Sequence, residues 1–419
     1  MDYFEIEGKN QLSGDVQISG AKNAVLPLMV ASILNNDQLT ISNVPNLSDS
    51  ITMANLLRGM GSEVELSDGK IHINSQSIND PYAPYDLVRK MRASFYVLGP
   101  LLSKFGEAKV SLPGGCAWGP RPVDFHIKGI EKLGATIDLE DGYIIAKSNK
   151  LKGNKIVFPK ISVGATGNVL MASVLADGDT EIHNAAAEPE IQQLCHFLNS
   201  IGAKISGVGT NTLQIQGVDS LNSVENIAVI PDRIEAGTFL MAVAATGGEV
   251  KLNKVNPNHL ETVISYLRHA NVNLDVGDDN ITVLSNGDIN SYNIETNEYP
   301  GFPTDLQAQW MLLMSVASGD STIKENIYFD RFNHVPELNR LGCNIDVDLK
   351  TATASIKGKR KLISANLTST DLRASACLII AALCAEGTSV VSRVYHIDRG
   401  YDKIEEKLSK IGARIVRKK

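Results

Sequence analysis

Apolar and polar positions along the chain follow one pattern that recurs at regular intervals. A predicted helix ends in an apolar residue, and a glycine, a small residue and an alternating strand follow. The glycine and small residue occur at Gly61-Ser62, Gly134-Ala135, Gly202-Ala203, Gly342-Cys343 and Gly412-Ala413, with a degraded copy at Ala270-Asn271. The period of about 70 residues divides the chain into six units. Each glycine is expected to stop its helix in the left-handed conformation.

A second helix in each unit is apolar on nearly all sides. Such helices are expected to be buried, because no face of them suits water. The six segments read AVLPLMVASIL, ASFYVLGPLL, GNVLMASVL, GTFLMAVAA, AQWMLLMSV and ASACLIIAAL.

The first unit predicts the order strand, helix, strand, helix, strand, strand (βαβαββ). Its Asp-Gly turn between alternating strands indicates a hairpin. The expected elements are strand 15–18, helix 21–35, strand 38–42, helix 48–61, strand 63–66, the turn Asp68-Gly69 and strand 71–74.

These units predict an α/β protein of two domains, each with three units whose apolar helices lie inside a ring of sheets. Residues 21–230 are expected to form one domain, residues 1–20 and 231–419 the other, with the active site in the cleft between them. The seam is placed near Ile230-Pro231. A linear solenoid is less favoured, because about 70 residues exceeds the usual solenoid period of roughly 20–50.

Composition narrows the class of protein. The chain has 419 residues and a net charge of -7, which argues against nucleic acid as a partner. Its five cysteines form no CxxC pair, which argues against a disulfide framework and suits a reducing cytosol. The start has no basic leader before an apolar run, and the longest apolar stretch, 376–385, is shorter than the roughly 20 residues of a membrane span. We therefore expect a cytoplasmic protein with no membrane partner.

The starts of the six apolar helices are the first candidate site. A helix N-terminus attracts anions through its free N–H groups. Lys22, Arg92 and Arg373 lie at three of these starts and predict a small substrate that carries phosphate or carboxylate. The alternative is that each basic residue only solvates its helix end.

The loop 111–122, SLPGGCAWGPRP, is the second candidate. Six of its twelve residues are Gly or Pro, and Cys116 lies between Gly115 and Ala117 with Arg121 nearby. A nearby cation lowers the pKa of a thiol, so Cys116 is a candidate nucleophile or proton donor. An adventitious surface thiol is the alternative, and the other four cysteines are expected to be packing residues.

Asp305 opens the apolar helix of the fifth unit. On sequence grounds we favour an N-cap role for its carboxylate, and the competing role is that of a general base. No metal-binding spacing, P-loop or dinucleotide fingerprint is present, so no metal or cofactor is expected.

Nine segments together resemble the enolpyruvyl transferases, specifically the branch that uses UDP-N-acetylglucosamine, and the resemblance covers the whole chain. These segments are SGAKNAVLP (19–27), RKMRAS (89–94), LPGGCAWGPRPVDFHIKG (112–129), SVGAT (162–166), AAAEPEI (185–191), PDRIEAGTF (231–239), YPGFPTDLQAQ (299–309), TDLRASA (370–376) and YHIDRGYDKIEEKL (395–408).

The resemblance implies a two-domain inverted α/β barrel of six βαβαββ repeats, three per domain, with the N-terminal strand crossing into the second domain. It also implies transfer of the enolpyruvyl group of phosphoenolpyruvate to the 3′-hydroxyl of UDP-N-acetylglucosamine, with release of phosphate. That reaction is the first committed step of peptidoglycan synthesis, and fosfomycin is implied as a covalent inhibitor.

Site residues follow from the same resemblance. Catalytic roles fall to Cys116 in proton transfer, Asp305 as the base for the sugar hydroxyl, and Lys22 and Arg399 as ligands of phosphoenolpyruvate. The implied substrate-binding residues are Lys22, Asn23, Arg92, Arg121, Pro122, Val123, Asp124, Phe125, Lys160, Ser162, Val163, Asp305, Ile327, Asp371, Arg373 and Arg399.

Two alternatives remain at this stage. The sister reaction loads enolpyruvyl onto shikimate 3-phosphate, and it uses the same fold and a similar basic cluster. A paralogue that binds the UDP-sugar without turnover is the other, and retention of Lys22, Cys116, Asp305 and Arg399 argues against it.

Overall fold

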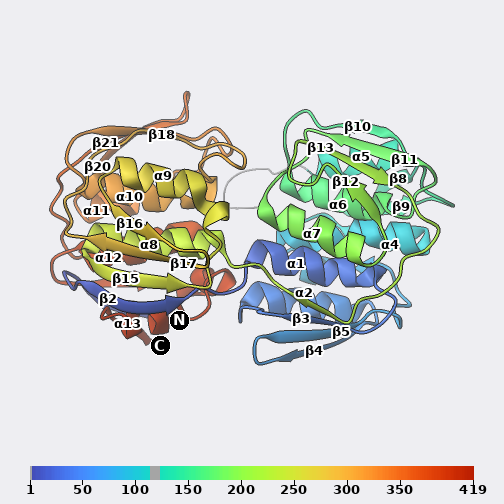
Figure 1. The fold of residues 1–419 in the computed structure, drawn as a ribbon, viewed down its shortest axis with the longest axis horizontal. Helices are drawn as coiled ribbons and strands as arrows, with labels where there is room; N and C mark the ends of the chain where they lie inside the picture. Colours follow the sequence, from blue (N-terminus) through green and yellow to red (C-terminus); the bar gives the residue numbers. More distant parts are fainter. Residues whose placement is uncertain (1, 114–122) are drawn as a thin grey trace. The chain divides into compact units, whose positions relative to one another are not determined.

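The computed structural model describes residues 2–113 and 123–419, which form two compact units (Figure 1). Unit 1 comprises Met1–Ser19 and Pro231–Lys419, and unit 2 comprises Gly20–Ile230. Each unit has its own hydrophobic core.

Three four-stranded sheets build unit 1. In order of pairing they are β22 (Asn366–Thr368), β23 (Thr388–Ser392), β1 (Tyr3–Glu7) and β24 (Arg414–Lys418); β16 (Asn273–Val276), β17 (Asn280–Ser285), β15 (Gly248–Asn253) and β2 (Leu12–Gln17); and β18 (Ile294–Glu295), β19 (Ser321–Lys324), β21 (Thr353–Lys357) and β20 (Asn344–Asp348).

Three further sheets build unit 2. They are β14 (Asn226–Ala228), β3 (Leu39–Ser42), β5 (Lys70–Asn74) and β4 (Glu63–Ser67); β6 (Tyr82–Ala83), β7 (Glu107–Ser111), β9 (Tyr143–Lys147) and β8 (Thr136–Glu140); and β10 (Lys155–Val157), β11 (Asp179–His183), β13 (Thr212–Gln216) and β12 (Lys204–Ser206).

All six sheets share one pairing scheme, in which one edge pair is parallel and the other two pairs are antiparallel. The scheme confirms the sixfold repeat. However, the prediction that the strand expected at 15–18 belongs to the first repeat is wrong. The strand expected at 15–18 is β2, and it pairs in parallel with β15 of unit 1. Its place beside β3 is taken by β14, from the end of unit 2.

The chain ends also complete the repeats. In the sixth repeat the hairpin partner of β24 is β1, from the opposite end of the chain. Hydrophobic alternation identifies a strand but not its neighbour, so the sequence pattern left these exchanges undetermined.

The first helix of each repeat is buried, as its all-round apolar sequence predicts. These helices are α1 (Lys22–Ala31), η2 (Arg92–Val97) with α4 (Leu98–Phe105), α6 (Val163–Ser173), α8 (Arg233–Thr246), η4 (Thr304–Leu306) with α10 (Gln307–Val316), and α12 (Leu372–Cys384). Every residue of α12 is buried, and α8, α10 and α12 contact one another. The helix expected at 21–35 is divided, because the 3₁₀ turn η1 (Ser32–Leu34) follows α1.

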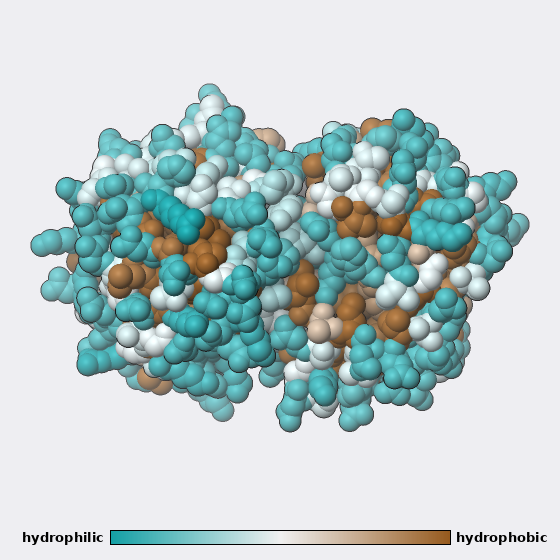
Figure 2. Space-filling view, viewed as in Figure 1, coloured by the Kyte–Doolittle hydropathy of each residue, from teal (hydrophilic) through white to brown (hydrophobic). Residues whose placement is uncertain are grey.

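The second helix of each repeat is amphipathic and half-exposed. These helices are α2 (Ser48–Gly59), α5 (Asp124–Lys132), α7 (Pro189–Ser200), α9 (Glu261–His269), α11 (Val335–Arg340) and α13 (Ile404–Lys410), and the remaining short turns are α3 (Tyr85–Val88), η3 (Pro257–Leu260) and η5 (Val394–Arg399). On the face drawn in Figure 2, hydrophilic residues cover most of each unit and hydrophobic residues form separate patches. No helix of the described ranges is long and apolar enough to cross a membrane.

The glycines that mark the repeat have the predicted left-handed backbone. Gly61 has φ 105° and Gly412 has φ 99°. In the degraded copy Asn271 takes over, with φ 68°. Apart from glycine, asparagine tolerates this conformation best. The turn therefore persists in this repeat although its glycine is lost.

Candidate active site

Three of the six buried helices have N-termini that are closed by a side chain. Ser162 Oγ accepts a hydrogen bond from Ala165 N at the start of α6. Asp232 caps α8, and Asp371 caps α12 through the N–H groups of Arg373 and Ala374 at 2.8 and 3.0 Å. A carboxylate at the cap satisfies these N–H groups and opposes the helix dipole. The ends of α8 and α12 are therefore poorer anion sites than the sequence analysis expected.

The other three starts have no side-chain cap: α1, η2 and η4. Their first turns contain the predicted ligands Lys22, Asn23, Arg92 and Asp305. With no side-chain cap, the starts of α1 and η2 keep their positive potential for an anionic ligand, whereas Asp305 in the first turn of η4 opposes it.

Lys22 in α1 is buried and forms an ion pair with Asp49 in α2, with 2.6 Å between Nζ and Oδ2. The Asp49 side chain is 4% exposed, so the pair lies in a poorly hydrated place where a charge needs a partner. Asn23 beside it is exposed. The acidic partner fixes the direction of the Lys22 ammonium group, and sequence analysis gave no sign of it.

Arg92 in η2 lies near a buried imidazole on α5. Burial, together with the positive charge of Arg92, lowers the pKa of His126 to about 3. His126 is thus neutral at pH 7. Its Nδ1 lies 3.0 Å from the amide nitrogen of Asn168, which also donates to Phe95 O. Because an amide nitrogen only donates, Nδ1 is the acceptor and Nε2 carries the proton.

Asn168 in α6 connects the segment that contains Arg92 to α4 and to α5. Its Oδ1 accepts the N–H of Gly99 at the start of α4, at 2.6 Å. A Cβ at Gly99 would lie 2.2 Å from Asn168 O, so only glycine fits there. Tyr96, also in η2, donates to Val163 O at 3.3 Å. The structure thereby brings the predicted residues Arg92 and Val163 into one connected region.

Phe125 stacks on Phe158, with ring centroids 6.3 Å apart. Val123 precedes α5 and is buried. Asp124 is half-buried, and its Oδ1 has no partner among the residues that the structure describes. The imidazole of His126 approaches Gly164, the residue after Val163. The segments 123–125 and 162–163 are thus neighbours, and Lys160 is exposed in the turn that leads into α6.

Asp305 is the centre of the predicted site in unit 1. Its Oδ1 accepts from Arg331 Nη1 at 2.9 Å, and its Oδ2 accepts from Arg373 Nη2 and Nε at 2.8 and 3.1 Å. It bonds no helix N–H as a cap. The N-cap prediction for Asp305 is therefore wrong, because two guanidinium groups from distant segments bind both oxygens.

These two cations also determine the protonation of Asp305. Burial by itself raises the pKa of this carboxyl, but the charges and hydrogen bonds of Arg373 and Arg331 outweigh burial and hold the pKa well below its usual range. Asp305 is an anion at every physiological pH. A carboxylate bound in this way is a weak base until one guanidinium leaves it.

Arg373 is supported from its other side by Tyr401. Its guanidinium lies over the Tyr401 ring at 5.5 Å from the centroid. The Tyr401 hydroxyl in turn contacts Thr238 Oγ1 at 2.8 Å and receives a hydrogen bond from Gln309 at 3.3 Å. Arg373 is 4% exposed and its Nη1 has no partner among the described residues, so one donor remains for a ligand.

Ile327 and Arg399 complete the predicted set in unit 1. Ile327 is half-buried in the turn after β19, and Arg399 is half-buried at the end of η5. Burial and the charge of Arg399 lower the pKa of His396, and the charge of Asp371 opposes them. A Cβ at Gly400, the residue after Arg399, would lie 2.6 Å from Leu372 Cδ2, so the end of η5 lies near the start of α12.

Cys116, Arg121 and Pro122 lie outside the described residues. The other four cysteines, Cys195, Cys343, Cys377 and Cys384, are free and buried, as the sequence predicts. Burial raises the pKa of Cys195 and of Cys384 to about 12, so these thiols stay protonated. The described residues contain no cluster of side chains suited to a metal ion.

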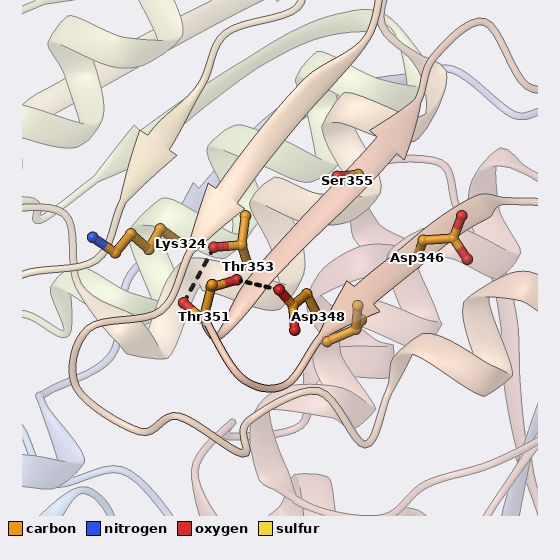
Figure 3. A pocket seen from close by; sticks show the side chains of 7 residues that line it. Lys324, Asp346, Asp348, Thr351, Thr353 and Ser355 are labelled. Carbon is orange, nitrogen blue, oxygen red and sulfur yellow. Dashed lines mark hydrogen bonds between the residues drawn. The ribbon is translucent and has the colours of Figure 1, made fainter.

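An open hollow of about 770 Å³ lies away from these groups, on the outer face of β19, β20 and β21 (Figure 3). Lys324, Asp346 and Thr353 are among the residues that line it, and none of the predicted site residues does. It is a feature of the sheet surface with no relation to the site.

Similarity to known proteins agrees with this architecture. A family model described as EPSP synthase (3-phosphoshikimate 1-carboxyvinyltransferase) matches residues 6–408, and the chain belongs to this family of enolpyruvyl transferases. Relatives named UDP-N-acetylglucosamine 1-carboxyvinyltransferase resemble it over its whole length. The protein from Chlorobium chlorochromatii (strain CaD3) is 50% identical, covering 100% of this chain and 99% of its own. That from Koribacter versatilis (strain Ellin345) is 49% identical, covering 100% and 96%.

Solved structures agree on the fold. The enolpyruvyl transferase NikO from Streptomyces tendae aligns with a TM-score of 0.91 at 25% identity, over 99% of this chain and 98% of that one. EPSP synthase from Acinetobacter baumannii aligns with a TM-score of 0.77 at 18% identity over the full length of both. The predicted enolpyruvyl transferase fold is confirmed.

Several residues of these networks were missed in the sequence analysis: Asp49, His126, Asn168 and Arg331. No motif connects them to their partners. Only contacts between segments tens of residues apart reveal them.

Proposed function

We propose that the protein transfers the enolpyruvyl group of phosphoenolpyruvate to the 3′-hydroxyl of UDP-N-acetylglucosamine and releases phosphate. The observation that carries this proposal is the 50% identity over the whole chain with a relative of that name. Identity with the EPSP synthase structure is only 18%, so shikimate 3-phosphate is the less favoured acceptor.

Phosphoenolpyruvate carries a phosphate and a carboxylate, and its proposed ligands are cations. Lys22, Arg121 and Arg399 are proposed to bind these two groups, with Arg92 nearby. Charge on them compensates the substrate in the ground state and the phosphate that leaves. The uncapped starts of α1 and η2 add N–H donors of the same polarity.

The proposed reaction has two stages. In the first, the sugar O–H bond breaks, its oxygen bonds to C2 of phosphoenolpyruvate, and C3 gains a proton, which gives a tetrahedral intermediate. In the second, the bond from C2 to the phosphate oxygen breaks and C3 loses a proton, which restores the alkene. Asp305 is proposed to take the hydroxyl proton, and Cys116 to serve the proton transfer at C3 and product release.

Asp305 needs a change in its partners before it can act as a base. While Arg331 and Arg373 both bind it, its pKa stays far below that of a useful base. An incoming phosphate or carboxylate competes with Asp305 for Arg373, whose Nη1 already has no protein partner among the described residues. Substrate binding thereby raises the basicity of Asp305 at the moment it is needed.

The sugar nucleotide is proposed to contact residues of both units. Among those of unit 2, residues 123–125 and 162–163 lie in neighbouring segments near His126. Among those of unit 1, Arg373 binds Asp305 directly. The proposed contacts are Asn23, Arg92, Arg121, Pro122, Val123, Asp124, Phe125, Lys160, Ser162, Val163, Asp305, Ile327, Asp371 and Arg373.

In the cell this reaction would commit UDP-N-acetylglucosamine to peptidoglycan. The protein is therefore proposed to act in the cytoplasm, in cell-wall synthesis and thus in the maintenance of cell shape and in division. Its chain has no membrane-spanning helix in the described ranges, which agrees with soluble substrates.

A phosphate-release assay with each acceptor tests the activity. We expect phosphate from phosphoenolpyruvate only when UDP-N-acetylglucosamine is added, and progressive loss of activity with fosfomycin. Release with shikimate 3-phosphate alone would assign the sister reaction. Tight binding of the UDP-sugar without turnover would make the protein a non-catalytic binder.

Cys116→Asp tests the proposed thiol. A carboxylic acid carries a proton but is not alkylated as a thiolate is, so the variant should keep some turnover and lose sensitivity to fosfomycin. Time-dependent inactivation by fosfomycin is the measurement. Inactivation at the wild-type rate would remove Cys116 as the covalent target.

A further inference from the structure

Glu325 is a fully buried carboxylate that the proposed reaction does not use. It follows β19, is 0% exposed, and has no ion pair within the described part of the chain. Its Oε1 accepts from Thr296 Oγ1 at 2.8 Å and from the N–H groups of Ile327 and Tyr328 at 3.0 Å each. Its Oε2 accepts from Thr304 Oγ1 at 3.0 Å.

The directions of these hydrogen bonds are determined by the neighbours. Thr304 Oγ1 accepts from Arg331 Nη1 at 2.9 Å, so its own proton points to Glu325. Thr296 Oγ1 accepts from Asn326 N at 2.9 Å, so its proton also points to Glu325. All four partners donate, which is the hydrogen-bonding pattern of an ionised carboxylate.

Two separate segments of unit 1 meet at this carboxylate. One is the turn η4, where Thr304 precedes Asp305. The other is the turn after β19, which contains Ile327. Arg331 adds a further connection to the turn η4, since its Nη1 donates to both Thr304 Oγ1 and Asp305 Oδ1. The two segments hold the proposed sugar contacts Asp305 and Ile327.

An isolated structural role would not require an anion. Burying a carboxylate without a paired cation is unfavourable, and neutral donors must compensate all of its lost hydration. Glutamine of the same shape would still accept from Ile327 N and Tyr328 N. Its amide would face Thr304 with a donor, where the Thr304 hydroxyl needs an acceptor. The negative charge is thus required at the Thr304 side, which leads to Asp305.

We propose that Glu325 is a positioning residue for the sugar nucleotide. It holds the Asp305 turn and the Ile327 turn in one fixed arrangement, through Thr304 on one oxygen and two backbone N–H groups on the other. This inference rests on the proposed function for its substrate, but the coupling between the two turns does not depend on it.

Glu325→Gln, Thr304→Val and the double variant test the coupling. Both single changes remove the hydrogen bond between Thr304 Oγ1 and Glu325 Oε2, and Thr304→Val also removes the acceptor of Arg331 Nη1. The double variant should therefore be no worse than Thr304→Val. We expect each to raise the KM for UDP-N-acetylglucosamine about fivefold to tenfold, as for loss of one buried hydrogen bond, with the KM for phosphoenolpyruvate within about twofold. Thr304→Ser keeps the hydroxyl and should restore wild-type values.

Ser285→Ala is the matched control for general loosening of unit 1. Ser285 is buried, donates to Ala244 O at 2.9 Å and accepts from Gly287 N at 3.0 Å, at the C-terminal end of α8. Its loss should leave both KM values unchanged. An equal rise in both KM values for Glu325→Gln, or additive effects in the double variant, would overturn the proposal.

Amide hydrogen exchange provides a readout that is independent of turnover. Thr304→Val and Glu325→Gln should speed exchange in peptides that contain residues 304–306 about tenfold and leave residues 326–328 protected. Glu325→Ala should speed exchange in both. If Glu325→Ala changes only residues 326–328, the two turns are not coupled and the inference fails, whatever the wild type does with its substrates. Wild-type protein without phosphate release, but with this exchange pattern, would refute the function and leave the coupling.

Discussion

The tripeptide Thr-Asp-Leu occurs at the start of two buried helices of unit 1, and its aspartate has a different role in each. At 370–372, Asp371 has an extended backbone and caps α12 through two N–H groups. At 304–306 the same three residues form the 3₁₀ turn η4, and Asp305 binds Arg331 and Arg373.

The difference arises from partners far along the chain. Arg331 is 26 residues from Asp305, and Arg373 is 68 residues from it. Hydrogen bonds between a guanidinium and a carboxylate are stronger than those from a neutral N–H group, so Arg331 and Arg373 determine where the Asp305 carboxylate lies. The comparison teaches that a capping motif is a local preference, which charged groups from other repeats override.

The largest expected difference between Asp305 and Asp371 is in turnover, and Asp305→Ala tests it. If Asp305 takes the hydroxyl proton, its removal should lower kcat by about 10² to 10⁴-fold, the usual contribution of a general base. Binding of UDP-N-acetylglucosamine, measured by calorimetry, should be mostly retained. Turnover near wild type would remove Asp305 as the base.

The second contrast is in the pH dependence of stability. Because the folded pKa of Asp305 is depressed, the carboxylate stabilises the fold above its unfolded pKa of about 3.9, and this contribution is lost as pH falls toward the folded value. Loss of one partner from a buried ion pair costs about 3–5 kcal/mol, and partial exposure of Asp305 places it at the lower end.

Urea unfolding of wild type and Asp305→Asn measures this difference. The gap in unfolding free energy should be constant from pH 7 to about 5 and should shrink below about pH 4. A gap that grows on acidification would contradict the assigned charge state. Asp320→Asn, in an exposed pair with Lys357, is the control and should leave the unfolding free energy nearly unchanged, because water screens such a pair.

Asp371 should give the smallest effect on stability. Asp371→Ala removes the cap of α12 and should lower the unfolding free energy by about 1 kcal/mol, whereas Asp371→Ser should restore most of it. Urea midpoints of the two variants, with unchanged slopes, are the measurement. Equal losses for Ala and Ser would contradict capping of α12 as the main contribution of the Asp371 side chain to stability.

Much of the fold could be predicted from the sequence because its signals are local. All-round apolar helices recur in every repeat and left-handed glycines in five of the six, and they are confirmed by burial and by φ respectively. The exchange of β2, β14 and β1 between repeats could not be read from the pattern. Strands with the same alternation are interchangeable until their neighbours are known.

The candidate site was predictable in part, through the resemblance and the basic residues at helix starts. Lys22, Arg92, Arg373 and Asp305 do lie in the first turns of buried helices. The acidic and neutral groups that hold them were not predictable. Asp49 lies 27 residues from Lys22, and no local pattern marks such a partner.

The most direct test of the account is the identity of the nucleotide product. Wild-type protein and Asp305→Ala are incubated with phosphoenolpyruvate and UDP-N-acetylglucosamine, and the sugar nucleotide is analysed by mass spectrometry. We predict the enolpyruvyl ether with wild type and almost none with Asp305→Ala. Two results would contradict the account: a sugar nucleotide that stays unmodified although the wild-type protein is folded, or equal amounts of product from wild type and Asp305→Ala.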